Sequence, residues 1–292
     1  MLLFVRTAAH EIEFFTFSQE QHWVPETHKS HQTDKVWAGT CNDLVLLCAT
    51  PTFQRCKVVR ILECEKESAL FKVEIFSSET CEWTQAVVPF PQDLTYDDFR
   101  SSVDHVAIAC NGTLYWLVSN GLVIALDPSE CDNRCSFISK PDVAAGLSAS
   151  SSCEQCLTVS RGRLRLCQFY NEPPRPIFYA WGLKENVHDV DGVGGKKVQW
   201  CLKEKIVLEK ILAGMFYWKP LALDPNDDDI LYALLYDCPK NPENFRLGKH
   251  YIRKSVTAFG ILTKPIPMQN RIEAFPIVMP RQWLPTPVPR LD

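Results

Sequence analysis

The chain of 292 residues is long enough to bury a substantial core, either in one large β domain or in two smaller ones. Its formal net charge of -4 argues against a general nucleic-acid partner, and no apolar run approaches the roughly 20 residues that cross a bilayer. Met1 to Val5 are apolar, but this run is too short for a signal peptide and no basic region precedes it. We therefore expect the thirteen cysteines to be reduced thiols in a cytoplasmic or nuclear protein.

Short apolar runs separated by turn residues predict β-strands through the first hundred residues. The predicted strands are, in order, Ile12–Phe17, 43–48, 57–62, 71–76 and one that begins at Trp83. The first is followed by a polar, histidine-bearing loop up to residue 35. Residues 89–104 are polar and contain proline, which predicts a connection.

The clearest local pattern lies between Val106 and Asp127, where three apolar runs are separated by two Asn-Gly dipeptides. Asn111-Gly112 and Asn120-Gly121 suit the positive φ of two-residue type I′ turns, so the stretch predicts a three-stranded antiparallel meander. The runs are almost continuously apolar, which predicts strands that are covered on both faces.

The second half of the chain repeats this theme of short paired strands. The predicted strands are 135–138, 156–159 paired with 163–169, 177–183 paired with 198–202, 221–224 paired with 230–236, and 255–262. A glycine-rich loop at 191–195 and an acidic turn at 225–229 join two of these pairs. Residues 205–212 fit either a strand or a short helix, and the proline-rich tail after Pro265 is predicted to be extended along the surface.

Many short strands at a spacing of about 8–12 residues, with few amphipathic helices, predict an all-β fold. Propeller blades take about 40–50 residues, so the chain has room for roughly six, and we favour a β-propeller over a sandwich. The predicted organisation has three parts. They are an N-terminal strand and polar loop (1–35), the propeller (36–264) and a Pro-rich C-terminal tail that packs on the propeller (265–292).

Four stretches carry motifs that occur together, in this order and spacing, in one family. They are Val73–Trp83, similar to V-x-(I/V)-(F/Y)-S-S-x-T-G-x-W; Cys110–Trp116 followed by Ile124–Asp127, similar to NGxLYWL and I-x-(A/G)-(F/L)-D; Leu221–Ile230, similar to HPxDxDIVYL; and Met279–Arg290, similar to the LPxWPTPVPR tail of grass members. The family that they resemble is the plant F-box proteins with an F-box-associated, kelch-like β-propeller. The resemblance covers about residues 40–290.

The resemblance implies a substrate receptor of an SCF-type (Skp–cullin–F-box) ubiquitin ligase. In this family a helical N-terminal F-box binds a Skp-type adaptor, and the propeller presents a target protein. The resemblance therefore implies a protein-interaction module that is not an enzyme, with a protein substrate as its partner and neither nucleic acid nor a membrane. Sequence alone does not name the target.

The sequence departs from the family at three places. Residues 1–40 contain neither the opening LPxDLLxxIL helix nor the CKxW segment, so we predict that the F-box is absent here and that a Skp-type adaptor binds only if an F-box is supplied elsewhere. Cys48-Ala-Thr-Pro51 runs almost directly into Lys57-Val-Val-Arg60, which predicts a shortened, incomplete first blade. Cys81 replaces the turn glycine of the family, which predicts a turn that needs no positive φ there.

The cysteines offer the best candidate for a metal site. Cys131 and Cys135, with Cys153 and Cys156, form a C-x3-C and C-x2-C arrangement that could supply the four ligands of a zinc ion. The interpretation that we favour is that these are reduced surface or loop cysteines.

Acidic residues and histidines give weaker patterns. Asp224-x-Asn226-x-Asp228 is similar to a calcium loop, but Asp229 and Leu235 stand where an EF-hand needs glycine and glutamate. We therefore predict a hairpin turn with local Asx hydrogen bonds. The remaining candidates are expected to lie in solvated or flexible loops, namely His22, His28 and His31, and Gly192, Gly194 and Gly195, which lack the βαβ context of a nucleotide-binding loop.

No catalytic, cofactor-binding or metal-binding residue is assigned, and no cofactor is expected. The tryptophans are predicted to pack within and between blades more often than they bind partners; they are Trp23, Trp37, Trp83, Trp116, Trp181, Trp200, Trp218 and Trp283. Two alternatives stay open. One is a metal-binding enzyme on an all-β scaffold, and the other is a truncated, non-functional product whose shortened first blade prevents ring closure.

Overall fold

The computed structural model describes the strands, one helix and many of the turns between them. The described residues are 2–6, 12–17, 23–25, 45–49, 56–62, 64–77, 79–91, 94–101, 107–118, 121–128, 135–141, 153–170, 176–186, 197–207, 216–237, 245–254, 256–260 and 271–275. Only the backbone is described for residues up to 56 and for 100–101, 185–186, 197, 216–218, 235–237, 245–247, 256–260 and 271–275.

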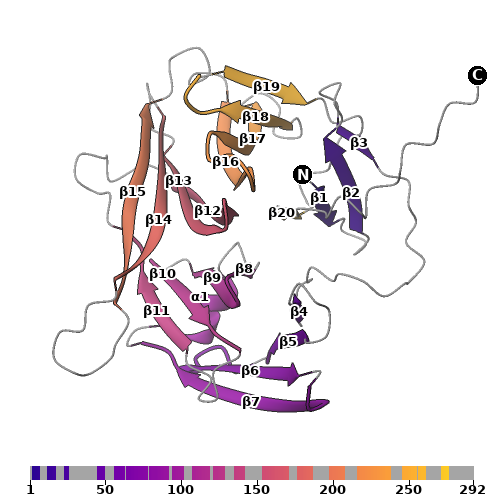
Figure 1. Cartoon of the computed structure of the whole chain (residues 1–292), viewed down its shortest axis with the longest axis vertical. Helices are drawn as coiled ribbons and strands as arrows, with labels where there is room; N and C mark the ends of the chain where they lie inside the picture. Colours follow the sequence, from indigo (N-terminus) through magenta and orange to yellow (C-terminus); the bar gives the residue numbers. More distant parts are fainter. Residues whose placement is uncertain are drawn as a thin grey trace, which may run out of the picture.

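The described strands form five antiparallel sheets of four strands each, arranged around a ring (Figure 1). Blade 1 contains β4 (Val45–Ala49), β5 (Cys56–Ile61), β6 (Leu70–Ser77) and β7 (Glu82–Pro89). Blade 2 contains β8 (Ile108–Cys110), β9 (Thr113–Val118), β10 (Leu122–Leu126) and β11 (Cys135–Ser139). Blade 3 contains β12 (Cys153–Ser160), β13 (Arg163–Tyr170), β14 (Ile177–Asn186) and β15 (Lys197–Val207). Blade 4 contains β16 (Phe216–Leu223), β17 (Ile230–Asp237), β18 (Phe245–Tyr251) and β19 (Val256–Gly260).

The fifth sheet, which we call the closing blade, joins the two ends of the described chain. Its order is β20 (Arg271–Phe275), β1 (Leu2–Arg6), β2 (Ile12–Phe17) and β3 (Trp23–Pro25). The C-terminal β20 therefore lies beside the N-terminal β1 and forms the inner strand of this blade (Figure 1). Of these four strands only β2 was predicted, because β1 and β20 become strands through pairing with distant chain rather than through a local pattern. The tail was expected to be extended along the surface, but residues 271–275 belong to a sheet.

The predicted all-β propeller is confirmed. The first strand of each sheet lies nearest the centre of the ring (Figure 1), and the inner strands β8, β12, β16 and β20 contact one another in turn. The described residues hold five sheets, where the length of the chain predicted about six blades. The domain boundaries stay a prediction.

Blade 1 corrects two expectations from the sequence. β4 pairs with β5, so this sheet has the same four strands as the others, and the prediction of a shortened first blade is wrong in strand number. Cys81, in the turn between β6 and β7, has φ 57°, so the prediction that this turn needs no positive φ is also wrong. Glycine adopts this conformation without steric cost, which explains why glycine suits the position in the family motif.

The hairpins of blades 2 and 3 follow from their turn residues. Asn111 and Gly112 have φ of 50° and 84°, as a type I′ turn requires, and the predicted meander of β8, β9 and β10 is confirmed. Arg161 and Gly162, with φ of 50° and 67°, make the same kind of turn between β12 and β13. Of residues 205–212, the first three end β15, and the remainder lies outside the described residues. β18 was not predicted.

A helix that was not predicted lies in the connection between blades 1 and 2. α1 (Tyr96–Ser101) begins after Thr95, whose hydroxyl accepts a hydrogen bond from the Asp98 N–H at 3.3 Å. The Asp98 carboxylate in turn accepts one from the Thr95 N–H at 2.9 Å, which completes a capping box. Tyr96 and Phe99 are buried, so the helix adds two aromatic rings to the core.

Three apolar clusters fill the spaces between neighbouring blades. The first joins blades 1 and 2, the second joins blades 2 and 3, and the third joins blades 3 and 4. Blade 2 contributes to the first two of these clusters, one on each of its faces, which explains why β9 is almost continuously apolar.

Candidate interaction surface

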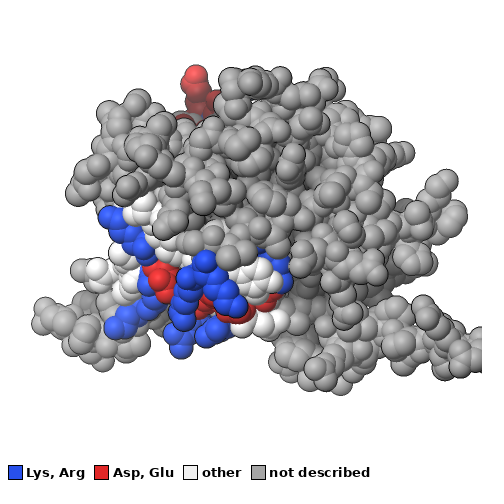
Figure 2. All heavy atoms as spheres, turned by 90° about the horizontal axis from the view of Figure 1, so that it is seen from above, with Lys and Arg blue, Asp and Glu red and all other residues white. Residues whose placement is uncertain are grey.

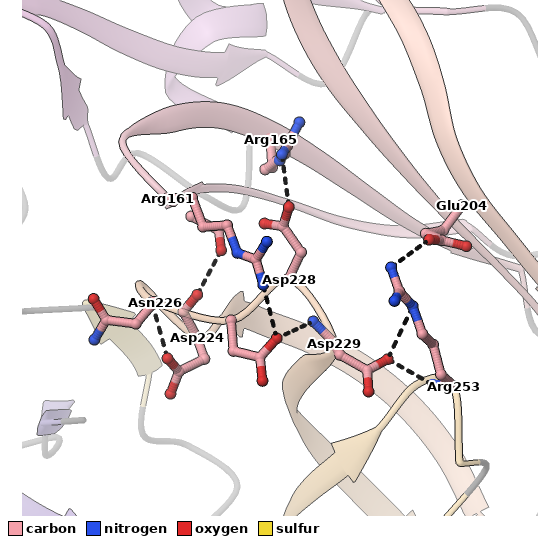
Figure 3. Close-up of polar contacts among 10 residues, drawn as sticks. Arg161, Arg165, Glu204, Asp224, Asn226, Asp228, Asp229 and Arg253 are labelled. Carbon is pink, nitrogen blue, oxygen red and sulfur yellow. Dashed lines mark hydrogen bonds and ion pairs between the residues drawn. The ribbon is translucent and has the colours of Figure 1, made fainter.

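Charged side chains gather where the turns of blade 4 meet blade 3. In an antiparallel sheet the turns after the first and third strands lie at the same end, so the β12–β13, β16–β17 and β18–β19 turns share one side of the ring. The described residues of these three turns are Arg161–Gly162, 224–229 and 252–254. Figure 3 shows the side chains that meet there.

The acidic turn between β16 and β17 is ordered by its own carboxylates. The Asp224 carboxylate accepts a hydrogen bond from the Asn226 N–H at 2.9 Å, and the Asp227 carboxylate accepts one from the Asp229 N–H at 3.1 Å (Figure 3). The predicted hairpin turn with local Asx hydrogen bonds is therefore confirmed. The buried Tyr232 hydroxyl also donates to Asp224 at 3.0 Å, and burial, with the Asp224 charge, raises the pKa of Tyr232.

Backbone contacts join this turn to blade 3. The Arg161 N–H donates to the Pro225 carbonyl at 2.7 Å, and the Ser160 hydroxyl donates to the Asp224 carbonyl at 2.6 Å. Ser160 is buried, so this bond also satisfies a polar group that has no access to water. These uncharged hydrogen bonds therefore fix the turn of blade 4 against the neighbouring hairpin without any ion pair.

A buried ion pair lies next to these contacts. The Arg165 guanidinium contacts the Asp228 carboxylate at 2.7 Å, and the Arg165 side chain is only 8 % exposed (Figure 3). Burial by itself raises the pKa of Asp228, but hydrogen bonding by Ser160 and Arg165 and the charges of Arg165 and Arg161 outweigh it and hold the pKa below its usual value. Asp228 is therefore ionised at neutral pH, and the pair is a charged one.

The position of Arg165 depends on a glycine in the next strand. Arg165 pairs across the sheet with Gly182 of β14, and a Cβ at Gly182 would lie 2.4 Å from the Arg165 Nη1 atom. A side chain at residue 182 would therefore displace the guanidinium from its carboxylate. We call the set Arg165, Asp228, Arg253, Asp229 and Glu204 the blade 3–4 clasp.

The outer part of the clasp is exposed. The Arg253 N–H donates to the Asp229 carboxylate at 2.7 Å, and its guanidinium lies 3.5 Å from Glu204 of β15 and 3.8 Å from Asp229 (Figure 3). The Arg253 side chain is 72 % exposed, so water weakens these ion pairs. Lys249 and Lys254 lie over the Tyr251 ring at 5.3 and 5.8 Å, which places further positive charge near this end of blade 4.

Seen from above, the described Lys and Arg side chains gather with Asp and Glu side chains between them (Figure 2). A surface of mixed charge suits recognition of another protein through polar contacts. The clasp was not predicted, although Arg165 lies between the apolar residues Leu164 and Leu166 of β13 and an acidic turn follows later in the chain. An isolated charge in a buried strand is the signal that could have found it.

The tryptophans divide between core and surface. Among those whose side chains are described, Trp116 and Trp200 are buried and Trp181 is half-buried, with its indole N–H donating to Gln168 at 2.8 Å. Trp83 of β7 is 50 % exposed. The expectation that the tryptophans mostly pack between blades therefore fits three of these four. The side chains of the others lie outside the described residues, namely Trp23, Trp37, Trp218 and Trp283.

The candidate zinc cysteines are not arranged for a common metal. Cys153 and Cys156 are three residues apart on the strand β12, so their thiols point to opposite faces of the sheet. Cys156 packs in the apolar cluster between blades 3 and 4. Burial raises the pKa of Cys135 to about 12 and also raises the pKa of Cys153, which disfavours the thiolates that zinc binds. Cys131 lies outside the described residues.

Other candidate ligands give no metal centre within the part of the chain that the structure describes. There, no group of three or more His, Cys, Asp or Glu side chains is placed to hold a metal ion. The histidines at 22, 28 and 31 and the glycines at 192, 194 and 195 lie outside the described residues. Within the described segments, no helix is long and apolar enough to cross a membrane.

The ring of four-stranded antiparallel sheets defines a β-propeller. The sequence model of the family described as "F-box protein At3g26010-like, beta-propeller" matches residues 25–236. The chain belongs to this family. No curated protein matches the chain.

Proposed function

We propose that this chain recognises a target protein for an SCF-type ubiquitin ligase and that it performs no catalysis itself. The observation that carries the proposal is membership of the F-box protein β-propeller family over residues 25–236. The exposed Arg253 of the clasp and the exposed Trp83 support a protein partner, because Arg and Trp dominate the binding energy of protein interfaces.

We further propose that the protein works in the cytoplasm or nucleus. The eight cysteines whose side chains are described are free thiols, which supports a reducing compartment. Adaptor binding belongs to a helical F-box, and the described residues before 40 form strands. We therefore expect that these 292 residues bind a target but not a Skp-type adaptor.

Cross-linking of the purified chain in plant extract, followed by titration of each purified candidate, tests the proposal. The expected result is one protein that binds saturably with one-to-one stoichiometry and whose ubiquitylation changes when the chain is overproduced. A chain that binds no protein saturably would contradict the proposed function. Direct binding of a Skp-type adaptor would contradict only the expectation about the F-box.

A further inference from the structure

One face of blade 1 carries an exposed apolar patch. Phe71, Val73 and Ile75 of β6 point into the cluster shared with blade 2, so the alternate residues of β6 and their partners on β7 form the opposite face. Leu70, Trp83 and Val87 lie on that opposite face and are 37, 50 and 49 % exposed. They are three of the five exposed large hydrophobic side chains among the described residues, and all three lie on one face of one blade.

The exposed Trp83 ring is held in place although it faces solvent. Phe76, directly opposite on β6, contacts it with ring centroids 5.5 Å apart. The Arg60 guanidinium lies 5.2 Å from the centre of the Trp83 ring and is itself hydrogen-bonded to Glu74. A fixed aromatic ring loses little conformational entropy on binding, which is a property of residues that dominate interfaces.

The strand that carries Trp83 also has no neighbour on its outer side among the described strands. β7 is the last strand of blade 1. The Phe90 N–H donates to the Ala69 carbonyl, so the even-numbered residues of β7 bond to β6, and the N–H and C=O groups of Trp83, Gln85 and Val87 point outward. Pro89 also occupies an outward position, where its missing N–H interrupts no ladder bond.

Most of the β7 edge lacks the charged residues that protect the outer edge of blade 3 from pairing with other chains. Between Trp83 and Val88 β7 has no charged residue. The outer strand β15 of blade 3, in contrast, carries Lys203, Glu204 and Lys205 in succession. Charges, lysine in particular, keep sheet edges from pairing with other chains. The outer strands β11 and β19 also carry no charged residue, so β7 is distinguished by the exposed apolar side chains of Trp83 and Val87 beside its edge.

We propose that an extended segment of a partner protein adds to β7 as a fifth strand of blade 1, with apolar side chains at alternate positions against Trp83 and Val87. Backbone bonds to the outward groups give affinity, and the patch selects the side chains. Lys72, beside Val87 on this face, has no ion-pair partner among the described residues, so the segment carries an acidic residue at that end. This proposal rests on the proposed function and names the surface that the target uses.

The size of the patch favours a single segment over a second copy of this chain. A stable interface between folded proteins takes about 20–30 residues from each side. The patch is formed by one face of two strands, and its edge runs only from Trp83 to Pro89. An extended segment of about seven residues matches that length.

A random peptide library displayed on phage and panned against the full chain provides the probe. Enriched sequences are then synthesised, and their binding is measured by fluorescence anisotropy. Gln85→Pro removes one outward N–H of the β7 edge without touching the β6–β7 ladder. Ser139→Pro is the matched control, because the Lys140 N–H bond to Gly121 places the Ser139 N–H outward on β11, the edge of blade 2. Trp83→Ser removes the ring and keeps the backbone.

The expected peptides have apolar residues at alternate positions and an acidic end. We expect Gln85→Pro to weaken their binding at least about tenfold, or about 1.4 kcal/mol, and Trp83→Ser to weaken it severalfold. Ser139→Pro should bind as the unmodified chain does. If Gln85→Pro unfolds the chain, unchanged binding by Trp83→Ser would still overturn the proposal.

Other outcomes also overturn it. A library that yields no enriched sequence would show that the edge is not the site. Enriched peptides whose affinity is the same for both β7 variants and for the unmodified chain would show the same. A concentration-dependent dimer that Gln85→Pro abolishes would assign the edge to a second copy. A target protein that binds the Gln85→Pro chain unchanged would refute this inference and leave the proposed function standing.

Discussion

The junction between blades 1 and 2 and the junction between blades 3 and 4 are held by different forces. At the first, Phe71 contacts Phe90, Phe99 and Trp116 with ring centroids 5.3 to 5.9 Å apart, all inside one apolar cluster. At the second, a smaller cluster is supplemented by the clasp, whose Arg165–Asp228 pair is largely buried.

The difference shows that one fold can combine a junction whose stability does not depend on pH or salt with a junction whose stability does. Apolar burial does not depend on ionisation and is not weakened by ordinary salt. Ion pairs and buried titratable groups depend on both, so the clasp junction should respond to conditions that leave the aromatic junction unchanged.

The largest effect is expected at the aromatic junction. Phe71→Ala removes a fully buried ring that contacts three other aromatic rings, and we expect the free energy of unfolding to fall by about 4 kcal/mol. Leu70→Ala is the matched control, since Leu70 is the neighbouring residue on the exposed face and should cost less than about 1 kcal/mol. Denaturant unfolding measures both. Equal losses would mean that blade 1 does not pack on blade 2 through Phe71.

The clasp junction should lose stability in mild acid. Burial lowers the pKa of His250, on β18 and near Asp229, from 6.5 to about 4, although the Asp229 charge opposes the shift. Between these two values the unfolded chain binds a proton that the folded chain does not, so stability falls as the pH drops from 6.5 to 4. The loss should reach about 3 kcal/mol.

His250→Gln separates this titration from those of the carboxylates. The variant removes the titrating group, so the fall in unfolding free energy between pH 6.5 and 5, where few carboxylates titrate, should largely disappear. A variant that keeps the full slope would place the sensitive group elsewhere. The Phe71→Ala chain should retain the slope, because its junction has no part in the titration.

Removal of Arg165 should cost less than removal of Phe71. Arg165→Leu leaves the Asp228 carboxylate without its ion-pair partner, a change that costs about 3–5 kcal/mol at fully buried sites. Asp228 is 29 % exposed, so water compensates in part and we expect about 2 kcal/mol. Arg163→Leu, at an exposed position two residues earlier on β13, should change stability by less than about 0.5 kcal/mol. A double variant Arg165→Leu with Asp228→Leu should recover part of the loss.

A strand, turn or helix could be predicted from the sequence where residues close together in the chain determine it. Asn111-Gly112 fixes a hairpin by its own conformational preference, and the meander was predicted with its turns in place. β1 and β20 form one sheet although they lie at opposite ends of the chain. No local sequence pattern around either strand predicts that pairing. The capping pair Thr95 and Asp98 was a local signal for α1, but proline and polar residues around it favoured a loop.

The sites were harder to predict than the fold for the same reason. Spacing alone brought Cys153 and Cys156 together as candidate ligands, whereas the two-residue period of a strand separates them. The clasp joins Arg165 to residues of another blade, so its partners could not be read from nearby sequence.

The smallest effect is expected at the exposed end of the clasp, where the contrast between the junctions should almost vanish. Arg253→Ala removes a side chain that is 72 % exposed and contacts Glu204 and Asp229, and exposed ion pairs contribute about 0–1 kcal/mol. Because the Arg253 N–H bond to Asp229 is a backbone bond, it survives the substitution and keeps the turn in place. Raising the salt concentration to 1 M shortens the screening length to about 3 Å and should remove the remaining difference in unfolding free energy between the variant and the unmodified chain. A loss above about 2 kcal/mol that persists in salt would mean that the Arg253 side chain supports the junction by packing rather than by charge.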